Sequence, residues 1–210
     1  MVKLTVYGDP KSSCTQRVLI LLEELELEYK LHSVDIQKKQ NKDSKFLNLN
    51  PFGKVPVVRY GERILFESRA ILRYISKNNS DEPEYDFTLD DNHEVNQWLE
   101  VESQTFNPII SKIVYEKVFK VMLDKETDTE IIKEQLELFK NVLTIYNEHL
   151  SLQKYIAGTE FSIADISHIP YLVYFVNSSK EYKNMLKEYP FVYKWFKRIT
   201  SREAVKKIVY

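Results

Sequence analysis

The sequence predicts two domains of different classes, an α/β domain followed by an all-helical one. Over residues 1–78, segments with strand-like alternation are interleaved with segments of helical periodicity. From residue 89 to residue 210, apolar residues recur at helical spacing and Gly158 is the only glycine. The intervening residues 79–88 are polar and contain a helix-breaking proline, so we interpret them as a linker.

The first domain opens with an alternating strand over residues 3–7, followed by a Leu-rich helix over residues 16–25. A second strand at 29–34 leads through a polar stretch and a short helix to a Pro/Gly turn at 50–53. The domain then ends with strands at 57–60 and 64–66 around a hairpin turn, and a helix over 67–77. This β-α-β-α-β-β-α order is typical of a thioredoxin-like domain, a mixed four-stranded sheet with helices on both faces.

The second domain is expected to contain helices over residues 95–122, 131–150, 163–176 and 191–199. Ser162 and Asp165 have the spacing of a capping box at the start of the third of these. In that motif the serine hydroxyl accepts from the amide three residues on, and the carboxylate reaches back to the serine amide. We therefore interpret Asp165 as a structural cap and not as a catalytic carboxylate.

Composition excludes several functions. With a net charge of -1, the chain has no basic surplus to neutralise a nucleic-acid backbone, so no nucleic-acid partner is expected. No apolar run approaches the roughly 20 residues that span a bilayer, and the start does not look like a signal peptide, so neither a membrane nor secretion is expected. The single cysteine, Cys14, fits a reducing compartment and predicts a cytoplasmic protein. The four histidines, His32, His93, His149 and His168, lack metal-ligand spacing, so no metal is expected.

Three short segments of the first domain carry residues suited to chemistry. Residues 8–15, a turn with Ser12, Ser13 and Cys14, precede the first helix, whose amino end would favour a negative charge such as a thiolate. Alternatively, these serines only cap the helix.

The second segment, residues 54–56, ends in a Val-Pro step that is consistent with a cis proline and would present the Val55 backbone to an extended peptide. In the third segment, Glu67 and Ser68 open a helix, where they could hold the amino-acid end of a ligand or serve as an ordinary cap.

The combined motifs resemble the glutathione transferases, and within them the serine-using phi class. The resemblance covers the whole chain and is carried by NPFGKVP at 50–56, FESRAI at 66–71, QWLEVE at 97–102, FNP at 106–108, YIAG at 155–158 and FSIAD at 161–165. It implies a glutathione-binding first domain and a helical domain with a pocket for a small hydrophobic electrophile. The implied reaction is attack by the glutathione thiolate, by substitution, addition or peroxide reduction. Glutathione is then a co-substrate, and no other cofactor is implied.

The same resemblance implies roles for individual residues. Ser12, five residues before Arg17, matches the catalytic serine whose hydroxyl donates to the thiolate. The implied glutathione contacts are Asn41 and Lys42 for the glycyl carboxylate, Lys54 and Val55, followed by Pro56, around the cysteinyl and γ-glutamyl parts, and Glu67 and Ser68 for the γ-glutamyl end. Asn41 stands where histidine or glutamine is common, and Lys54 stands where glutamine is usual. The candidate electrophile pocket consists of Lys11, Tyr115, Phe119 and Met122. Phe52, on a protruding turn, is the expected contact of a homodimer.

Two alternatives stay open at this point. Cys14 could be a nucleophile that forms a mixed disulfide, although it lies only three residues before Arg17, whereas the reactive cysteine of cysteine-using relatives matches Ser12. The chain could also be a non-catalytic member of this fold that carries a ligand or serves as an interaction module.

Overall fold

The computed structural model describes residues 3–79 and 93–209 and divides the chain into two compact units. The first comprises Met1–Thr88 together with Glu203–Tyr210, and the second comprises Leu89–Arg202. Apart from Asn79, the predicted linker at 79–88 lies outside the described residues. Among the helices that the structure describes, none combines the length and the apolarity needed to cross a bilayer.

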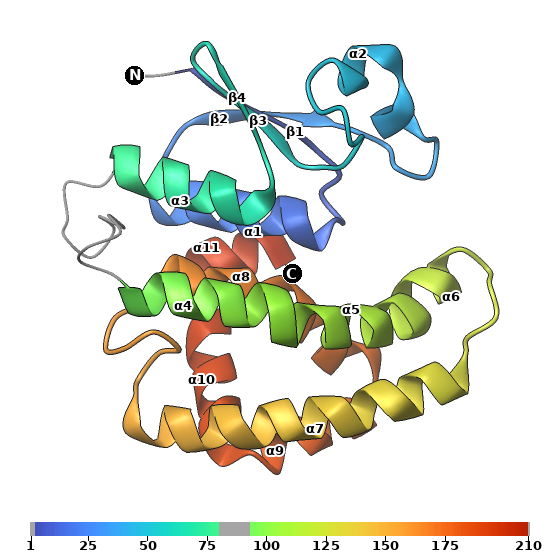
Figure 1. The fold of residues 1–210 in the computed structure, drawn as a ribbon, viewed down its shortest axis with the longest axis vertical. Coiled ribbons are helices and arrows are strands. Elements are labelled where there is room, and N and C mark those ends of the chain that lie inside the picture. Colours follow the sequence, from blue (N-terminus) through green and yellow to red (C-terminus); the bar gives the residue numbers. More distant parts are fainter. Residues whose placement is uncertain (1–2, 80–92, 210) are drawn as a thin grey trace. The chain divides into compact units, whose positions relative to one another are not determined.

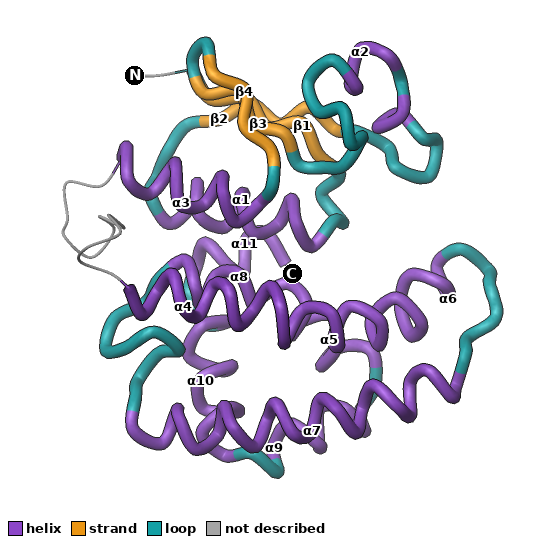
Figure 2. The backbone as a smooth tube through the Cα atoms, viewed as in Figure 1, coloured by secondary structure: helices purple, strands orange, loops and turns teal. Residues whose placement is uncertain are grey.

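The first unit confirms the predicted order of strands and helices (Figures 1 and 2). Its elements are β1 (Leu4–Gly8), α1 (Ser13–Glu24), β2 (Tyr29–Ser33), the 3₁₀ turn η1 (Gln40–Lys42), α2 (Ser44–Leu47), β3 (Val57–Tyr60), β4 (Arg63–Phe66), α3 (Ser68–Asn79) and α11 (Glu203–Val209). The strands form one sheet in the order β2-β1-β3-β4. The β1–β2 pair is parallel, whereas β1–β3 and β3–β4 are antiparallel.

Helices cover both faces of this sheet, as predicted. Figure 1 shows α1 and α3 side by side on one face, and the two helices are in contact. On the other face, Phe46 of α2 packs into a small buried cluster with Val57, against Tyr7 and Phe66. The side chains of Tyr7, Val57 and Phe66 share this face because they are direct cross-strand partners.

The last helix, α11, departs from the predicted domain division. Residues 89–210 were expected to form one helical domain, but α11 packs against α1 in the first unit. Val205 is fully buried, and the Lys207 ammonium pairs with Glu23 at 2.6 Å. The apolar contact and the ion pair give α11 a partner 184 residues away in the sequence, which no local periodicity can indicate.

Apart from an isolated bridge between Tyr155 and Gly158, all regular elements of the second unit are helices over its described residues. It contains α4 (His93–Val101), α5 (Asn107–Val114), α6 (Lys120–Met122), α7 (Thr129–Leu152), α8 (Ile163–Ser178), α9 (Lys180–Lys187) and α10 (Pro190–Thr200), with π-helical turns η3 (Glu102–Phe106) and η4 (Tyr115–Phe119). The predicted helix at 95–122 thus corresponds to five consecutive helical segments.

The capping box at the start of α8 is confirmed, and it is buried. The Asp165 carboxylate accepts from the Ser162 amide at 2.9 Å and the Ile156 amide at 3.0 Å. It also accepts from the Ser162 hydroxyl at 3.2 Å and the Trp195 indole at 2.7 Å. Burial raises the pKa of this carboxyl to about 6, although all four donors favour the charged form. Asp165 therefore joins the α8 start to α10 and to the loop before α8.

Candidate functional site

The sheet topology brings all the predicted glutathione residues to one edge. Because β1 and β2 are parallel, both end there, and β1 leads to Ser12 while β2 leads to Asn41 and Lys42. Because β3 is antiparallel to β1, it begins at this edge, directly after Val55 and Pro56. β4 is antiparallel to β3 and ends at this edge, directly before Glu67 and Ser68. Segments spread over more than fifty residues are therefore neighbours.

Ser12 is the N-cap of α1 and remains half-exposed. Its backbone is extended, and its hydroxyl oxygen accepts from the Thr15 amide at the long distance of 3.5 Å. This cap uses only a lone pair of the hydroxyl, which leaves the O–H hydrogen available as a donor. Among the described residues, no acceptor takes that hydrogen. A role as helix cap is thus compatible with a role in ligand binding, because the hydroxyl can accept from the Thr15 amide and donate to a ligand at the same time.

The turn that carries Ser12 is held tightly against the sheet. The Ser12 amide donates to the Asp9 carbonyl at 2.9 Å, and the Lys11 amide donates to the Asp9 carboxylate at 2.9 Å. At Gly8, an added Cβ would come within 2.6 Å of the buried Thr15 side chain, so only glycine allows this approach of strand and helix. The Ser12 carbonyl in turn accepts from the Gln16 amide at 2.9 Å, so backbone hydrogen bonds fix Ser12 on both sides.

Cys14 is the second residue of the same helix, within its first turn; it is half-buried and accepts from the Arg17 guanidinium at 3.4 Å. Arg17 is fully buried. Ser13, between the two candidate residues, is also buried. Of the three side chains at this helix start, Ser12 is the N-cap and the only one that precedes the first helical residue.

Asn41 and Lys42 hold the neighbouring Pro/Gly turn. The Asn41 amide donates to the Gly53 carbonyl at 2.7 Å, and the Lys42 ammonium donates to the Phe52 carbonyl at 3.2 Å. Gly53 has a positive φ of 59°, and an added Cβ would meet the Lys42 nitrogen at 2.7 Å. Each of the two donor groups still has hydrogens left for a carboxylate.

Sequence reasoning gave no role to Asn50, which completes this turn. Its side chain accepts from the Phe52 amide at 3.1 Å and donates to the Lys54 carbonyl at 2.8 Å. Asn50 is buried, whereas Phe52 is 64% exposed. The sequence did contain a signal for this role of Asn50. An asparagine directly before a proline favours a turn in which the asparagine side chain forms a hydrogen bond with the backbone of the residue two positions later.

The Val55–Pro56 peptide bond is cis, as the sequence indicated. Val55 is half-buried, and its N–H and C=O make no backbone hydrogen bond to another described residue. Pro56 is buried and directly precedes β3. At Val55 the edge therefore presents a backbone donor and a backbone acceptor that no described residue uses, the pair that an extended peptide needs for strand-like pairing.

Glu67 and Ser68 form the remaining corner of the site. Glu67 has a left-handed φ of 68°, uncommon for a residue with a side chain, and its carbonyl begins α3 by accepting from the Ile71 amide at 2.9 Å. The Glu67 side chain is exposed, and Ser68 behind it is buried. Backbone strain of this kind concentrates at ligand-binding positions, which supports a role beyond capping.

The candidate electrophile residues are only partly brought together. Tyr115 and Phe119 of η4 line a cavity of about 500 Å³ in the second unit, with Lys112, Ile131 and Tyr171 among the other lining residues. Met122 does not line this cavity and is 54% exposed. Lys11 is an exposed residue of the β1–α1 turn, in the first unit.

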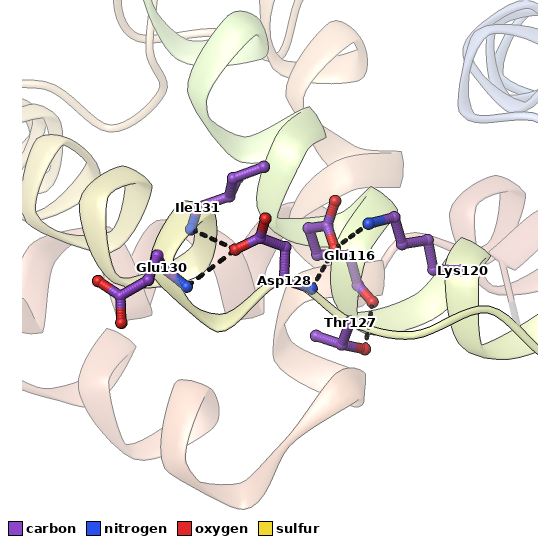
Figure 3. A network of polar contacts seen from close by, with 6 residues as sticks. All are labelled: Glu116, Lys120, Thr127, Asp128, Glu130 and Ile131. Atoms are coloured by element: carbon purple, nitrogen blue, oxygen red, sulfur yellow. Dashed lines mark hydrogen bonds and ion pairs between the residues drawn. The ribbon is translucent and has the colours of Figure 1, made fainter.

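Figure 3 shows a polar network at the start of α7, and two of its residues, Glu116 and Ile131, also line this cavity. The buried Glu116 carboxylate, next to Tyr115, pairs with Lys120 at 2.8 Å and accepts from the Asp128 amide at 2.7 Å. Asp128 caps α7 by accepting from the amides of Glu130 and Ile131. The hydrogen bond from Lys120 lowers the pKa of the Glu116 carboxyl. The network ties η4 to the start of α7, the helix that carries Ile131. Sequence reasoning missed Glu116, because only its burial separates it from an ordinary surface i,i+4 pair.

Within residues 3–79 and 93–209, no three His, Cys, Asp or Glu side chains are grouped to hold a metal ion. His168 is buried in the second unit, with one ring nitrogen 2.7 Å from the Ala164 carbonyl and the other 3.1 Å from the Tyr146 hydroxyl. Both ring nitrogens are therefore engaged in the helical core.

Comparisons with known proteins agree with this geometry. Residues 2–77 match the family described as glutathione S-transferase, N-terminal domain, and residues 106–203 match glutathione S-transferase, C-terminal domain. Glutathione S-transferase F4 of Arabidopsis thaliana is 38% identical over 205 residues, which cover 96% of this chain and 82% of the relative.

Solved structures show the same relationship. Glutathione transferase F7 of Populus trichocarpa has a TM-score of 0.90 and 37% identity, covering 98% of this chain and 97% of its own. Glutathione S-transferase I from maize, in complex with an atrazine glutathione conjugate, has a TM-score of 0.89 and 30% identity, covering 99% of this chain and 96% of its own.

Proposed function

Since this chain belongs to the glutathione S-transferase family, with plant phi-class relatives, we propose that it transfers the glutathione thiolate to small hydrophobic electrophiles, with Ser12 as the activating residue. The observation that carries the proposal is the convergence of Ser12, Val55 and Glu67–Ser68 at one edge of the sheet. The maize relative solved with an atrazine glutathione conjugate supports a conjugation reaction. Detoxification is the role that such a reaction serves.

Ser12 acts on the charge of the thiol. A free thiol has a pKa of about 8.5, so most of it is protonated at neutral pH. The unused O–H of Ser12 donates to the thiolate but gains little from the neutral thiol, and the amino end of α1 adds its positive dipole. Lowering the thiol pKa by roughly two units corresponds to about 2.7 kcal/mol of preferential thiolate binding. The thiolate then attacks the electrophile directly, without a covalent enzyme intermediate.

The remaining residues of the edge hold the peptide. The free N–H and C=O of Val55 pair with the glutathione backbone, and the exposed Glu67 carboxylate faces the γ-glutamyl ammonium. Ser68 and the amino end of α3 take the γ-glutamyl carboxylate. Lys42 supplies positive charge for the glycyl carboxylate, Lys54 lies beside Val55 along the central part of the peptide, and Asn41 contributes mainly by shaping the turn at Gly53.

For the acceptor we propose the cavity lined by Tyr115 and Phe119. Its volume of about 500 Å³ lies within the range of small-molecule sites, and its lining includes two aromatic rings in addition to Tyr171. This aromatic lining supports an aromatic or other flat apolar electrophile as the second substrate. Met122 and Lys11 are not needed for that assignment.

The decisive experiment measures glutathione binding by calorimetry and turnover of a chromogenic aryl halide with the same preparation. We expect saturable binding of glutathione and a rate that depends on both substrates. Phe119→Ala should raise the Michaelis constant for the aryl halide more than that for glutathione. Binding of glutathione without turnover on aryl halides, isothiocyanates or hydroperoxides would instead support the non-catalytic carrier.

We further propose a cytosolic homodimer that uses Phe52. The ring of Phe52 is 64% exposed on a turn that Asn41, Lys42 and Asn50 make rigid, and its only described ring contact is with Phe66. An exposed anchor on a rigid turn fits a pocket of a partner subunit. Light scattering should give about twice the chain mass of 25.0 kDa, and Phe52→Ser should lower it. A monomeric wild type at micromolar concentration would contradict this part of the proposal.

A further inference from the structure

The lining of the proposed acceptor cavity includes one charged group that is buried. Besides the rings of Tyr115, Phe119 and Tyr171, the cavity is lined by Glu116. Glu116 is only 3% exposed, whereas none of the other residues that line the cavity is buried. A buried carboxylate is costly unless its oxygens are paired, so the contacts of both oxygens decide what this group can do.

The two oxygens of the Glu116 carboxylate are used unequally. The Lys120 ammonium at 2.8 Å and the Asp128 amide at 2.7 Å both donate to Oε2 (Figure 3). No described residue donates to Oε1. Oε1 is not completely enclosed by protein atoms either, and the open space that Glu116 lines is the cavity. Since each carboxylate oxygen can accept two hydrogen bonds, Oε1 offers the cavity an acceptor that the protein leaves unused.

The same contacts fix the charge and the direction of this acceptor. The hydrogen bond from Lys120 lowers the pKa of the Glu116 carboxyl, so the group is ionised at neutral pH. Both donors hold Oε2, which turns Oε1 away from them. Hydrogen bonds to an ionised acceptor are shorter and stronger than those between neutral groups. A ligand with a hydrogen-bond donor therefore gains more at Oε1 than a ligand without one.

The charges around Glu116 favour a neutral donor over a cation. The ion pair with Lys120 already compensates the Glu116 carboxylate, and the Asp128 carboxylate is used in capping α7. Lys112 also lines the cavity, is exposed, and makes no ion pair within residues 3–79 and 93–209. Its positive charge repels a cationic ligand, whereas a neutral O–H or N–H group is not repelled.

We propose that Glu116 is a specificity-determining residue of the acceptor site and selects neutral aromatic electrophiles that carry an O–H or N–H donor. The donor bonds to Oε1, and the ring of the electrophile lies against Tyr115 and Phe119. An electrophile without a donor leaves Oε1 against an apolar group, which costs affinity. The inference rests on the proposed function in taking this cavity as the acceptor site.

The first test measures binding to the full chain saturated with glutathione, using two ligands that differ only in the donor. By calorimetry, 2-methoxynaphthalene should bind at least about tenfold more weakly than 2-naphthol, because a hydrogen bond to a charged group contributes roughly that factor or more. Equal affinity for the two ligands would overturn the proposal, and this comparison needs no variant.

The second test measures turnover of 4-hydroxyphenethyl and 4-methoxyphenethyl isothiocyanate. Their reacting groups are identical and are insulated from the ring by two methylene groups. The value of kcat/KM should therefore favour the hydroxyl compound in the same sense as binding does. A binding preference without turnover of either compound would retain the role of Glu116 and contradict the transferase. Turnover of both compounds without any preference would overturn only the role of Glu116.

Glu116→Gln reverses the polarity of the group that faces the cavity. Because Lys120 and Asp128 both donate at the Oε2 position, the amide oxygen must take that position and the NH₂ group then replaces Oε1. The preference for 2-naphthol over 2-methoxynaphthalene should fall to within about threefold, since only a neutral hydrogen bond is left. By contrast, 2-acetylnaphthalene, which carries only an acceptor, should bind the variant more tightly than the wild type. An unchanged preference in the folded variant would overturn the proposal.

The matched control is Glu137→Gln, which makes the same change at an exposed position of α7 that does not line the cavity. Glu137 also pairs with a lysine, Lys140, at 2.7 Å. The control should keep the wild-type preference for 2-naphthol within about twofold, because an exposed ion pair contributes little and lies outside the site. Equal loss of the preference in Glu137→Gln and Glu116→Gln would mean that the oxygen of Glu116 is not what selects the ligand.

Discussion

Ser12 and Ser162 both stand at the N-cap of a helix, yet the two caps differ in almost every other respect. Ser162 is buried, its hydroxyl accepts from the Ala164 amide at 3.2 Å, and it donates to the Asp165 carboxylate at 3.2 Å. Ser12 is half-exposed, accepts from the Thr15 amide at 3.5 Å, and has no acceptor for its hydrogen among the described residues.

The difference shows how one local motif can serve stability or chemistry. At α8 the residue three positions after the serine, Asp165, closes a network in which the hydroxyl uses both its donor and its acceptor capacity. At α1 the equivalent position is Thr15, which has no charge to close such a network. The cap at α1 thus stays open toward a ligand, and the comparison can be tested through the two serines and their partners.

The largest effect is expected for Asp165→Ala, which leaves the Ser162 and Ile156 amides, the Ser162 hydroxyl and the Trp195 indole without their acceptor. An unsatisfied buried donor costs about 1–3 kcal/mol, and removal of the buried charge offsets part of the sum. We expect a loss of about 2–4 kcal/mol in the free energy of unfolding, measured in urea at pH 7. The turnover of each folded molecule of Asp165→Ala should equal that of the wild type. If this variant were as stable as the wild type but lost most of its turnover, Asp165 would instead have a catalytic role.

The pH dependence of stability is the second largest effect. Burial raises the pKa of folded Asp165 to about 6, above its ordinary value of 3.8, so folding favours the protonated form. The contribution of this carboxyl to stability is therefore highest below pH 4, falls as the pH rises through 6, and is constant above. Over this pH range the contribution of Asp165 to the free energy of unfolding falls by about 3 kcal/mol, because its folded and ordinary pKa values differ by roughly two units.

The unfolding free energy of the wild type minus that of Asp165→Asn, measured between pH 4 and pH 7, isolates this group from the other carboxyls. That difference should fall with rising pH. A difference that rises with pH would mean that the four hydrogen bonds outweigh burial and that the folded pKa lies below 4.

Ser12→Ala tests the open cap. The hydroxyl bonds to a charge that is fully present only in the thiolate, and such a hydrogen bond contributes roughly 1.5–3 kcal/mol. We expect turnover of the aryl halide to fall about ten- to hundredfold while glutathione affinity changes less, because Val55, Glu67 and Ser68 hold the peptide. The pKa of the bound thiol, read from thiolate absorbance, should rise toward its free value.

The neighbouring side chains provide matched controls, because Ser13→Ala and Cys14→Ala alter the same helix start without removing the N-cap hydroxyl. Both should keep most of the turnover. Full activity and an unshifted pH profile in Ser12→Ala, combined with loss of activity in Cys14→Ala, would replace the serine mechanism by the cysteine one.

The sequence could predict those features of the two caps and of the fold that depend on local patterns. The strands, the main helices, the capping box at Ser162 and the cis bond at Val55–Pro56 all have signals within a few residues. Features created by tertiary packing were not visible. The packing of α11 against α1 includes the ion pair between Lys207 and Glu23, which are far apart in the sequence. The polar network beside the acceptor cavity depends on the burial of Glu116, whose carboxylate accepts from the Asp128 amide.

For the candidate site, the sequence predicted which residues gather at the sheet edge, but it did not predict the hydrogen bonds that they make in the structure. Asn41 and Lys42 were expected to face a carboxylate, and the structure shows them bonded to the carbonyls of Gly53 and Phe52. The turn at 50–53 reaches these donors only because β2 and β3 bring both segments to one edge. Sequence spacing alone cannot distinguish a donor that holds a ligand from one that holds the turn beside it.

The smallest predicted effect is the difference in stability between the two serine-to-alanine variants. Replacement of an N-cap serine by alanine typically costs about 0.5–2 kcal/mol. Ser162→Ala belongs at the upper end, because it removes an acceptor at 3.2 Å and leaves a buried carboxylate with one donor fewer. Ser12→Ala belongs at the lower end, about 0.5 kcal/mol, because its bond to the Thr15 amide is 3.5 Å long and half-exposed, where water can replace it. Urea unfolding of both variants at pH 7, with glutathione absent, measures the difference. If Ser12→Ala proved as costly as Ser162→Ala, the α1 cap would be structural in the same sense as the α8 cap, and any loss of turnover in Ser12→Ala would have to be corrected for a displaced helix start.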